Sequence, residues 1–553
     1  MTDSPASSDS EQNSANDEDL QGGWFSHVRM VSILTFLSRM LGLVRDVGMA
    51  ALFGNGPLLD AFTLAFRLPN MSRRLLGEGA LTTAFLPAYV KELKQDPLRA
   101  NRLASAVLFI LLLILSFVVL VGELGLYGLA SSHVLGTSSQ LILSMTAWLL
   151  PYVVLICLSA QLTAILHSLG HFAVPALVPV LLNVVWIFAL WVIVPGATGQ
   201  ETQIAIIISA ILLGGVGQLI LPWWVLHRKG FRIQTKCTDQ IPQAVRVFRS
   251  MLPIVIGLSV TQLNALCDGA LAWWYARPEQ GEWIASGTAS ALYYGQRLYQ
   301  FPLGVFGIAL GTVLFARLAH HVEAGNRKQI SQDVAEGLRL MLTIGCPASV
   351  GLILLATPLA DCLLRHGQFD AHDAQQTAAT IAAYGTAIWA FLGISLTQRV
   401  YYALGDAQTP VRIGLICVAM NLALNFLFMN FLGGVGLAYA TALSAGCQFL
   451  GLIYFLRAKI ELHFTTETRS FFGKVLLSTL LMAAGCWGLV QWFGVEPVGW
   501  MRMLRLVVPL VFSVFIYWGL LRIFRIRELD YILGIQKTLE ITPKPLENDE
   551  HLR

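Results

Sequence analysis

Apolar residues in this chain of 553 residues gather in long runs, each of about 18 to 25 residues. A run of that length can cross the hydrocarbon core of a bilayer as an α-helix, because the core is about 30 Å thick and a helix rises about 1.5 Å per residue. Only 13% of the residues are charged, compared with about 25% in soluble globular domains. The sequence therefore predicts an all-α polytopic membrane protein and excludes a soluble globular fold.

There are about fourteen such runs, centred near residues 40, 75, 113, 152, 184, 213, 258, 303, 345, 390, 420, 445, 482 and 512. Lysine and arginine concentrate in every second loop, for example at Arg228, Lys229 and Arg232 after the sixth run. Loops rich in these residues stay in the cytoplasm, and an even number of spans brings both ends of the chain to one side. Both termini are therefore predicted to be cytoplasmic.

The two ends of the chain are polar. Residues 1–24 are rich in Ser, Asn and acidic residues and lack the basic start and apolar core of a signal peptide, so we expect a disordered acidic cytoplasmic tail. Residues 527–553 are expected to form a second cytoplasmic tail. No loop is long enough for a catalytic domain of about 100 residues, so we do not expect an enzyme. The net charge of +4 is too small to indicate nucleic-acid binding.

The second run resembles the eighth when the numbering is shifted by 230 residues. The matched pairs are Arg67 with Arg297, Leu68 with Leu298, Gly77 with Gly307, Thr82 with Thr312, Phe85 with Phe315 and, with a shift of 235, Gly170 with Gly405 and Pro175 with Pro410. Copies six spans apart have the same orientation, and parallel repeats typify transporters with a substrate site between the halves. The repeat therefore favours a transporter with its substrate site between two halves, with chance matching as the alternative.

Charged side chains lie inside the first two runs, where contact with lipid would be energetically costly. The first run contains Arg39, Arg45 and Asp46, and the second contains Asp60, Arg67, Arg73, Arg74 and Glu78. An arginine at the bilayer centre costs roughly 2.5–3.5 kcal/mol on insertion scales. The spacing of Asp60, Arg67, Arg74 and Glu78 keeps them within about 40° on one face of a helix. These side chains are therefore expected to face one another, water or a charged ligand.

Positive charge exceeds negative charge in this group. The arginines are Arg39, Arg45, Arg67, Arg73, Arg74 and, in the eighth run, Arg297, and the carboxylates are Asp46, Asp60 and Glu78. Internal ion pairing accounts for the carboxylates but leaves positive charge uncompensated. Because arginine presents planar, forked donors that suit phosphate oxygens, we favour an anionic substrate over purely structural pairing.

A second polar group lies in the other half of the chain. It comprises Gln262, Asn264 and Asp268 in the seventh run, Asn421 and Asn425 in the eleventh, and Thr441 in the twelfth. Carboxylate, amide and hydroxyl oxygens at this density can hold Na⁺ or a proton. Hydrogen bonding between helices explains the spacing equally well, so both interpretations stay open at this point.

Several motifs are similar to those of the MurJ (MviN) family of bacterial lipid II flippases, in the MOP exporter superfamily. They are SRMLGLVRD at 38–46, DAF at 60–62, FRLPN at 66–70, RR at 73–74, GEGA at 77–80, YGQRLYQFPLG at 294–304 and GDAQTPV at 405–411. The resemblance extends from about residue 28 to residue 526 and implies fourteen transmembrane helices. These are two pseudo-symmetric six-helix lobes, residues 25–235 and 240–460, around a central cavity, plus two C-terminal helices in residues 468–526 that form a groove for a lipid tail.

The implied substrate is lipid II, the undecaprenyl-diphosphate-linked disaccharide-pentapeptide used in peptidoglycan biosynthesis. The resemblance assigns diphosphate binding to Arg39, Arg45, Arg73, Arg74 and Arg297, gating or orienting to Ser38, Asp46, Asp60, Arg67 and Glu78, and a sodium site to Asp268, Asn421, Asn425 and Thr441. Three positions depart from the family pattern. Gln296 replaces an acid, Ala316 replaces a proline, and Asn425 replaces a carboxylate of the cation site.

The predicted mechanism is alternating access by a monomer in the bacterial inner membrane. Lipid II and membrane lipids are its expected partners, no cofactor is expected, and the membrane potential, with Na⁺ or H⁺, would reset the cycle. A flippase for another polyprenyl-diphosphate-linked oligosaccharide is one alternative. A cation-coupled multidrug exporter of the same superfamily is another, although its cavity should be acidic or aromatic rather than rich in arginine. A lipid-modifying enzyme would need a catalytic or metal cluster at a membrane face, and the sequence contains none.

Overall fold

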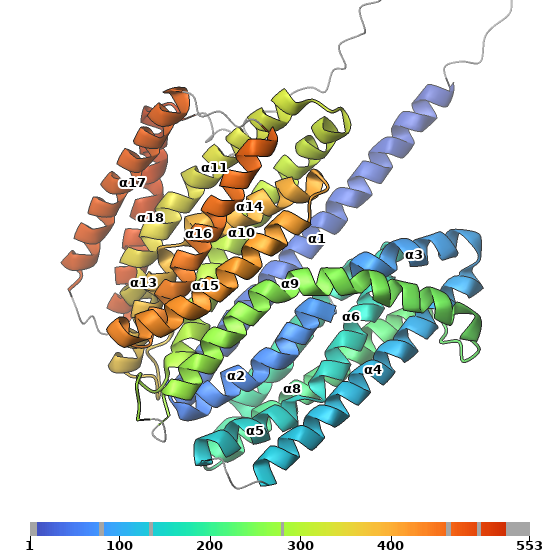
Figure 1. Ribbon diagram of the computed structural model, residues 1–553, viewed down its shortest axis with the longest axis horizontal. Helices are drawn as coiled ribbons and strands as arrows, with labels where there is room; N and C mark the ends of the chain where they lie inside the picture. The colour runs from blue at the N-terminus through green and yellow to red at the C-terminus, as the bar shows by residue number, and fades with distance from the viewer. Residues whose placement is uncertain are drawn as a thin grey trace, which may run out of the picture. The chain divides into compact units, whose positions relative to one another are not determined.

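The computed structural model describes residues 8–76, 82–131, 136–277, 281–460, 466–494 and 499–526 (Figure 1). Every regular element within these residues is helical. The α-helices are α1 (Ser8–Phe53), α2 (Pro57–Ser72), α3 (Thr82–Gln95), α4 (Pro97–Ser131), α5 (Thr137–Leu149), α6 (Tyr152–Ser168), α7 (Ala173–Phe188), α8 (Gln200–Arg228), α9 (Ile241–Tyr275), α10 (Thr288–Glu323), α11 (Arg327–Leu354), α12 (Ala356–Leu363), α13 (Ala371–Gly385), α14 (Ile388–Ala403), α15 (Gln408–Leu432), α16 (Val435–Ile460), α17 (Thr466–Trp492) and α18 (Trp500–Ile523). The predicted all-α class is confirmed.

Ten stretches of helix in the described residues are long and apolar enough to cross a membrane, or eleven if α13 and α14, which meet at a 45° bend, form one span. The helix α1 is not among them, because Arg39, Arg45 and Asp46 interrupt its apolar run. The helix α2 has only 16 residues and is not among them either. The predicted count of fourteen spans therefore stays a prediction, and the helices that carry the unusual charges are those that apolarity alone does not identify.

The helix α1 begins at Ser8, so the backbone of residues 8–24 is helical where we expected a disordered tail. The C-terminal tail predicted for 527–553 lies outside the described residues. The chain separates into two compact units. The first contains residues up to Tyr294 together with Leu363–Thr377 and Gly414–Ala440, and the second contains Gly295–Cys362, Ala378–Ile413 and the chain from Thr441 onward. These units do not follow the lobe boundaries that the resemblance implies, and the lobes stay a prediction.

The internal repeat is visible in matching helix boundaries. With the shift of 235 residues, the start of α7 coincides with that of α15, and the start of α8 with that of α16. Gly170 and Gly405 end the preceding helices with φ of 71° and 75°, the left-handed region that glycine adopts most readily. After each glycine, the next amide N–H donates to the carbonyl oxygen five residues earlier at 2.9 Å. The same helix cap therefore occurs at equivalent places in both copies.

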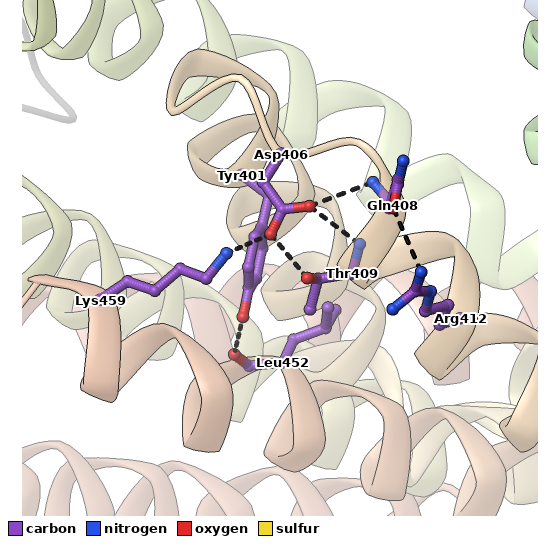
Figure 2. Close-up of polar contacts among 7 residues, drawn as sticks. All are labelled: Tyr401, Asp406, Gln408, Thr409, Arg412, Leu452 and Lys459. Atoms are coloured by element: carbon purple, nitrogen blue, oxygen red, sulfur yellow. Dashed lines mark hydrogen bonds and ion pairs between the residues drawn. The ribbon is translucent and has the colours of Figure 1, made fainter.

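The second copy adds a charged cap at this turn, within the second unit. The Asp406 carboxylate accepts hydrogen bonds from the backbone N–H groups of Gln408 at 3.1 Å and Thr409 at 3.0 Å, and from the Thr409 hydroxyl at 2.6 Å (Figure 2). Lys459 on α16 also donates to this carboxylate. The Lys459 ammonium, followed by the Thr409 hydroxyl, holds the pKa of Asp406 well below its usual range. The equivalent residue of the first copy is His171.

The C-terminal helices α17 and α18 lie side by side in the second unit (Figure 1). Phe471, Val475 and Met482 of α17 form a buried apolar cluster with Tyr517 and Leu521 of α18. The Tyr517 hydroxyl donates to the carbonyl oxygen of Thr343 on α11 at 2.8 Å. The pair is therefore anchored on α11 by apolar packing and by this satisfied buried hydroxyl, while its role as a lipid-tail groove stays a prediction.

Candidate functional site

Arg45 on α1 is the most completely enclosed of the predicted phosphate ligands, with 5% of its surface exposed. Its Nη2 lies 2.6 Å from Asp46 Oδ1, and its Nη1 donates to Asn183 Oδ1 on α7 at 3.0 Å. The guanidinium carbon also lies 4.4 Å from the centre of the Trp186 ring, within the range of a cation–π contact. These contacts exist because α1 packs along α7. Arg45 is therefore held in a fixed orientation by three residues of the first unit.

The Asn183 amide also ties this arrangement to Ser38. Its Nδ2 donates to the Ser38 carbonyl oxygen at 3.0 Å, so Ser38 takes part through its backbone. The Asp46 carboxylate in turn accepts a hydrogen bond from the Tyr293 hydroxyl at 3.3 Å. Asp46 is 3% exposed, and a buried carboxylate needs such donors because water does not reach it.

A small pocket lies beside Asp46 in the same unit and has a cavity volume of about 10 Å³, roughly the space of a single water molecule. It is lined by Asp46, Met49, Leu59, Phe62, Thr63, Phe66, Trp186, Tyr293 and Tyr294. Most of these side chains are aromatic or aliphatic, and Trp186 meets both Phe62 and Phe66 edge-on. Ligand pockets usually enclose about 300–1,000 Å³. The conformation described here therefore encloses Asp46 without offering room for a lipid headgroup at this place.

Arg39, Arg73 and Arg74 are half-buried rather than enclosed. Arg39, one and a half turns before Arg45 on α1, makes no hydrogen bond or ion pair with any residue that the structure describes. Arg73 Nη2 donates to Asn70 Oδ1 at 3.1 Å. Residues 73–76 form a widened π-helical turn directly after α2, a local irregularity that is frequent at functional sites.

Arg67 on α2 has a different environment from Arg73 and Arg74, which follow the helix. Its guanidinium donates to the carbonyl oxygen of Ala265 on α9. Gly269, one turn further along α9, leaves room for it, since a Cβ there would lie 2.7 Å from Arg67 Nη1. Arg67 therefore joins α2 to α9. The sequence placed it on one stripe with Arg74, and its contacts now distinguish the two.

Asp60 on α2 is 2% exposed. Its carboxylate contacts the N-terminus of α10 and not an arginine among the described residues. Its carboxylate accepts hydrogen bonds from the backbone N–H groups of Gly287 at 2.9 Å and Ser290 at 2.7 Å, and from the Ser290 hydroxyl at 2.6 Å. A carboxylate at a helix N-terminus satisfies donors that have no partner within the helix and complements the helix dipole. The predicted gating or orienting role of Asp60 stays a prediction.

The remaining predicted residues are placed elsewhere. Arg297 on α10 belongs to the second unit and is half-buried. Its neighbour Gln296, which departs from the family pattern, donates to the Tyr384 hydroxyl at 3.1 Å. Glu78 lies outside the described residues, as does the side chain of Ala316.

The predicted cation residues Asp268, Asn421 and Asn425 come together in the first unit, on α9 and α15. Asn425 Nδ2 donates to Asp268 Oδ1 at 2.7 Å and to Asn421 Oδ1 at 3.1 Å. Asn264 Nδ2 approaches Asp268 Oδ2 at 3.5 Å. Thr441 on α16 is assigned to the second unit and is 9% exposed. Na⁺ is bound by oxygen ligands. The Asn425 Nδ2 group, which points its N–H at the Asp268 carboxylate, therefore does not fit a sodium site.

Sequence reasoning missed Asn183, Trp186 and Ser290. Asn183 is a polar residue in an otherwise apolar run, and Trp186 follows it by three residues on the same helix face, which is a signal that could have identified both. Ser290 could have been found from the repeat, because it is the residue equivalent to Asp60 under the shift of 230.

Comparison with known proteins identifies the family of the chain. The family described as "Lipid II flippase MurJ" matches residues 49–507. A probable lipid II flippase MurJ from Vibrio cholerae is 34% identical, covering 82% of this chain and 86% of the relative. One from Haemophilus influenzae is 32% identical, covering 90% and 99%. The lipid II flippase MurJ of Burkholderia cenocepacia is 29% identical, covering 90% and 96%.

Solved structures show the same fold. A lipid II flippase MurJ in an inward closed conformation matches with a TM-score of 0.73 at 23% identity, covering 92% of this chain and 99% of that one. An inward-facing multidrug resistance MATE transporter of the MOP superfamily matches with a TM-score of 0.62 at 14% identity, covering 77% and 94%. With the family match, these sequence relatives and the shared fold in agreement, the chain belongs to the MurJ family of lipid II flippases.

Proposed function

We propose that this chain moves lipid II from the cytoplasmic to the periplasmic leaflet of the bacterial inner membrane by alternating access, acting as a monomer and not as an enzyme. The observation that carries the proposal is Arg39, a half-buried arginine on α1 with no hydrogen bond or ion pair among the described residues. An arginine left available within the membrane suits an anionic ligand, and its forked donors match phosphate oxygens. The diphosphate of lipid II supplies such oxygens.

The contacts divide the work among the arginines. Arg45 already directs its donors at Asp46 and Asn183, so it shapes the site and supplies positive potential. Arg39, Arg73 and Arg74 are the proposed diphosphate ligands, and Arg297 of α10 would join them during the cycle. Arg67, bonded to a backbone carbonyl of α9, maintains the packing of α2. A cavity with this surplus of positive charge also disfavours cationic drugs.

The proposed orientation places both termini in the cytoplasm. It rests on the lysine- and arginine-rich loops, such as that between α8 and α9, which follow the positive-inside rule. Reporter fusions test it. A fluorescent protein that requires the cytoplasm should fluoresce after residue 553, and alkaline phosphatase fused there should be inactive. An active phosphatase fusion would show that the C-terminus is periplasmic and would contradict the proposed orientation.

Transport is tested in bacteria depleted of their own lipid II flippase. Cells that express this chain should grow and should expose newly made lipid II at the periplasmic face. Arg39→Ala should reduce the translocation rate by about ten- to a hundredfold, since a hydrogen bond to a charged group contributes about 1.5–3 kcal/mol. Arg412→Ala is the matched control, because Arg412 is exposed and, among the residues that the structure describes, bonds only Gln408 in its own helix.

Three results would count against the proposal. If Arg39→Ala translocates lipid II at the unmodified rate, the arginine assignment is wrong. If cells expressing the chain do not translocate lipid II but do move another polyprenyl-diphosphate-linked oligosaccharide, the substrate is wrong while the diphosphate chemistry stands. If the chain moves neither and instead exports cationic drugs, the function itself is wrong.

A further inference from the structure

Asp268 lies at the centre of a buried polar group between α9 and α15. Asp268 and Asn425 are both 0% exposed and Asn421 is 1% exposed. A single nitrogen, Asn425 Nδ2, donates to the Asp268 carboxylate at 2.7 Å and to the Asn421 amide oxygen at 3.1 Å. The carboxylate and the amide oxygen are thus bridged by a positively polarised N–H₂ group of the chain itself.

A sodium ion in this group would need the same two oxygens. Hard cations are bound by oxygen and not by N–H donors, so Asn425 Nδ2 would first have to leave. Rotating the amide would turn Asn425 Oδ1 toward Asp268 Oδ1, and two oxygens at hydrogen-bond distance repel each other unless a proton or cation lies between them. Binding Na⁺ therefore means giving up two hydrogen bonds, one of which involves a charged acceptor.

The residue type at position 425 decides whether the Asp268 and Asn421 oxygens are bridged by an N–H₂ group or by a cation. Aspartate has nearly the same size as asparagine, but it has no N–H donor and adds a negative charge. We propose that Asn425 is a built-in substitute for a coupling cation, so that the polar group around Asp268 works without Na⁺. This inference rests on the proposed transport function. Its test measures Na⁺ binding and not transport, so a failure of the inference is distinguishable from a failure of the proposed function.

The test uses the full-length chain in lipid nanodiscs, heated in NaCl or in choline chloride of equal ionic strength. Wild-type protein should melt at the same temperature in both salts. Asn425→Asp should show a saturable rise of melting temperature with Na⁺ and should bind Na⁺ at least about tenfold more tightly than the wild type, since the loss of the two competing hydrogen bonds is a factor of that order. Asn430→Asp makes the same change at an exposed position of α15 and should not respond to Na⁺.

A second variant keeps the proposal testable if Asn425→Asp does not fold. Asn425→Ala removes the bridging N–H₂ group, opens space beside Asp268 and Asn421, and should also gain a saturable response to Na⁺, weaker than that of the aspartate variant. Saturable stabilisation of the wild-type chain by Na⁺ overturns the proposal. It is equally overturned if neither position-425 variant responds to Na⁺, because the amide would then not occupy a cation's place.

Discussion

Asp60 on α2 and Ser290 on α10 occupy equivalent positions in the two copies of the internal repeat and are hydrogen-bonded to each other, with Ser290 Oγ 2.6 Å from Asp60 Oδ1. The starts of α2 and α10 therefore meet here, within the first unit, through two residues that the repeat pairs. The chemistry there is asymmetric, because one copy supplies a carboxylate and the other supplies donors.

Removing the Asp60 carboxylate should destabilise the start of α10. Asp60→Ala leaves the N–H groups of Gly287 and Ser290 without their acceptor, and loss of a helix cap costs about 1–2 kcal/mol of unfolding free energy. Asp60→Asn, which keeps one acceptor oxygen, should lose less. Thermal unfolding of the purified chain measures both. Ser290→Ala is the control, since both backbone donors remain. If it destabilises the chain as strongly as Asp60→Ala, the backbone bonds are not the main contribution.

Asn183 should matter although it carries no charge. Asn183→Ala removes the partner of Arg45 Nη1 and leaves a buried charged donor unsatisfied, which costs about 1–3 kcal/mol. We expect a lower melting temperature and a several-fold lower rate of lipid II translocation in flippase-depleted cells. Asn430→Ala, exposed on α15, should change neither. A translocation rate for Asn183→Ala equal to that of the unmodified chain would show that the orientation of Arg45 is set by Asp46 and Trp186 alone.

Substitutions of Arg67, Arg73 and Arg74 should have different phenotypes. Arg67→Ala removes a donor from a backbone carbonyl of α9, so it should lower thermal stability by about 1 kcal/mol. Arg73→Ala and Arg74→Ala should instead lower the translocation rate at nearly unchanged melting temperature. Measuring melting temperature and lipid II translocation for all three variants tests this division. It is wrong if Arg67→Ala melts normally and abolishes transport.

Much of the fold was predictable from the sequence because a membrane leaves few choices to the backbone. Long apolar runs must be helices there, since every backbone polar group has to bond within its own segment. Helix interruptions were harder to predict. The break between α5 and α6 at Pro151 and the 45° bend between α13 and α14 interrupt apolar runs that appear continuous. Bends of this kind depend on packing as much as on residue type.

The candidate site was predictable as a set of charges but not as a set of contacts. Arginine in lipid is costly enough to be noticed in any sequence. By contrast, the Arg45 contact with Asn183 joins residues 138 positions apart, so it depends on how α1 packs along α7. The same holds for Arg67, whose spacing placed it on one helix face with Arg74 and whose guanidinium bonds the Ala265 carbonyl of α9. At Asn425 the sequence identified the departure, and the hydrogen-bond geometry supplies its consequence.

The repeated helix caps should respond alike to the same substitution. Gly170 and Gly405 both have positive φ, a conformation that costs an L-residue roughly 1–2 kcal/mol. Gly170→Ala and Gly405→Ala should each lower the unfolding free energy by about that amount. Gly473→Ala, at a helical position of α17 with open space around it, should be neutral or slightly stabilising. Thermal unfolding compares the three, and a large difference between the first two would argue against structural equivalence of the caps.

The second cap should also give the chain a pH-dependent contribution to stability. Lys459 and Thr409 lower the pKa of Asp406 in the folded chain, so the cap stabilises when Asp406 is ionised. That contribution is complete above the unfolded-state pKa, about 3.9, and is lost as the pH falls through the lower folded-state value. Asp406→Asn should therefore melt at a lower temperature than the wild type at pH 7, and the difference should shrink as the pH drops below about 4.

Lys459→Met should show the same trend, whereas Arg412→Met, which leaves the Asp406 carboxylate hydrogen-bonded, should not. A difference between Asp406→Asn and the wild type that stays constant with pH would mean that the Asp406 charge does not contribute.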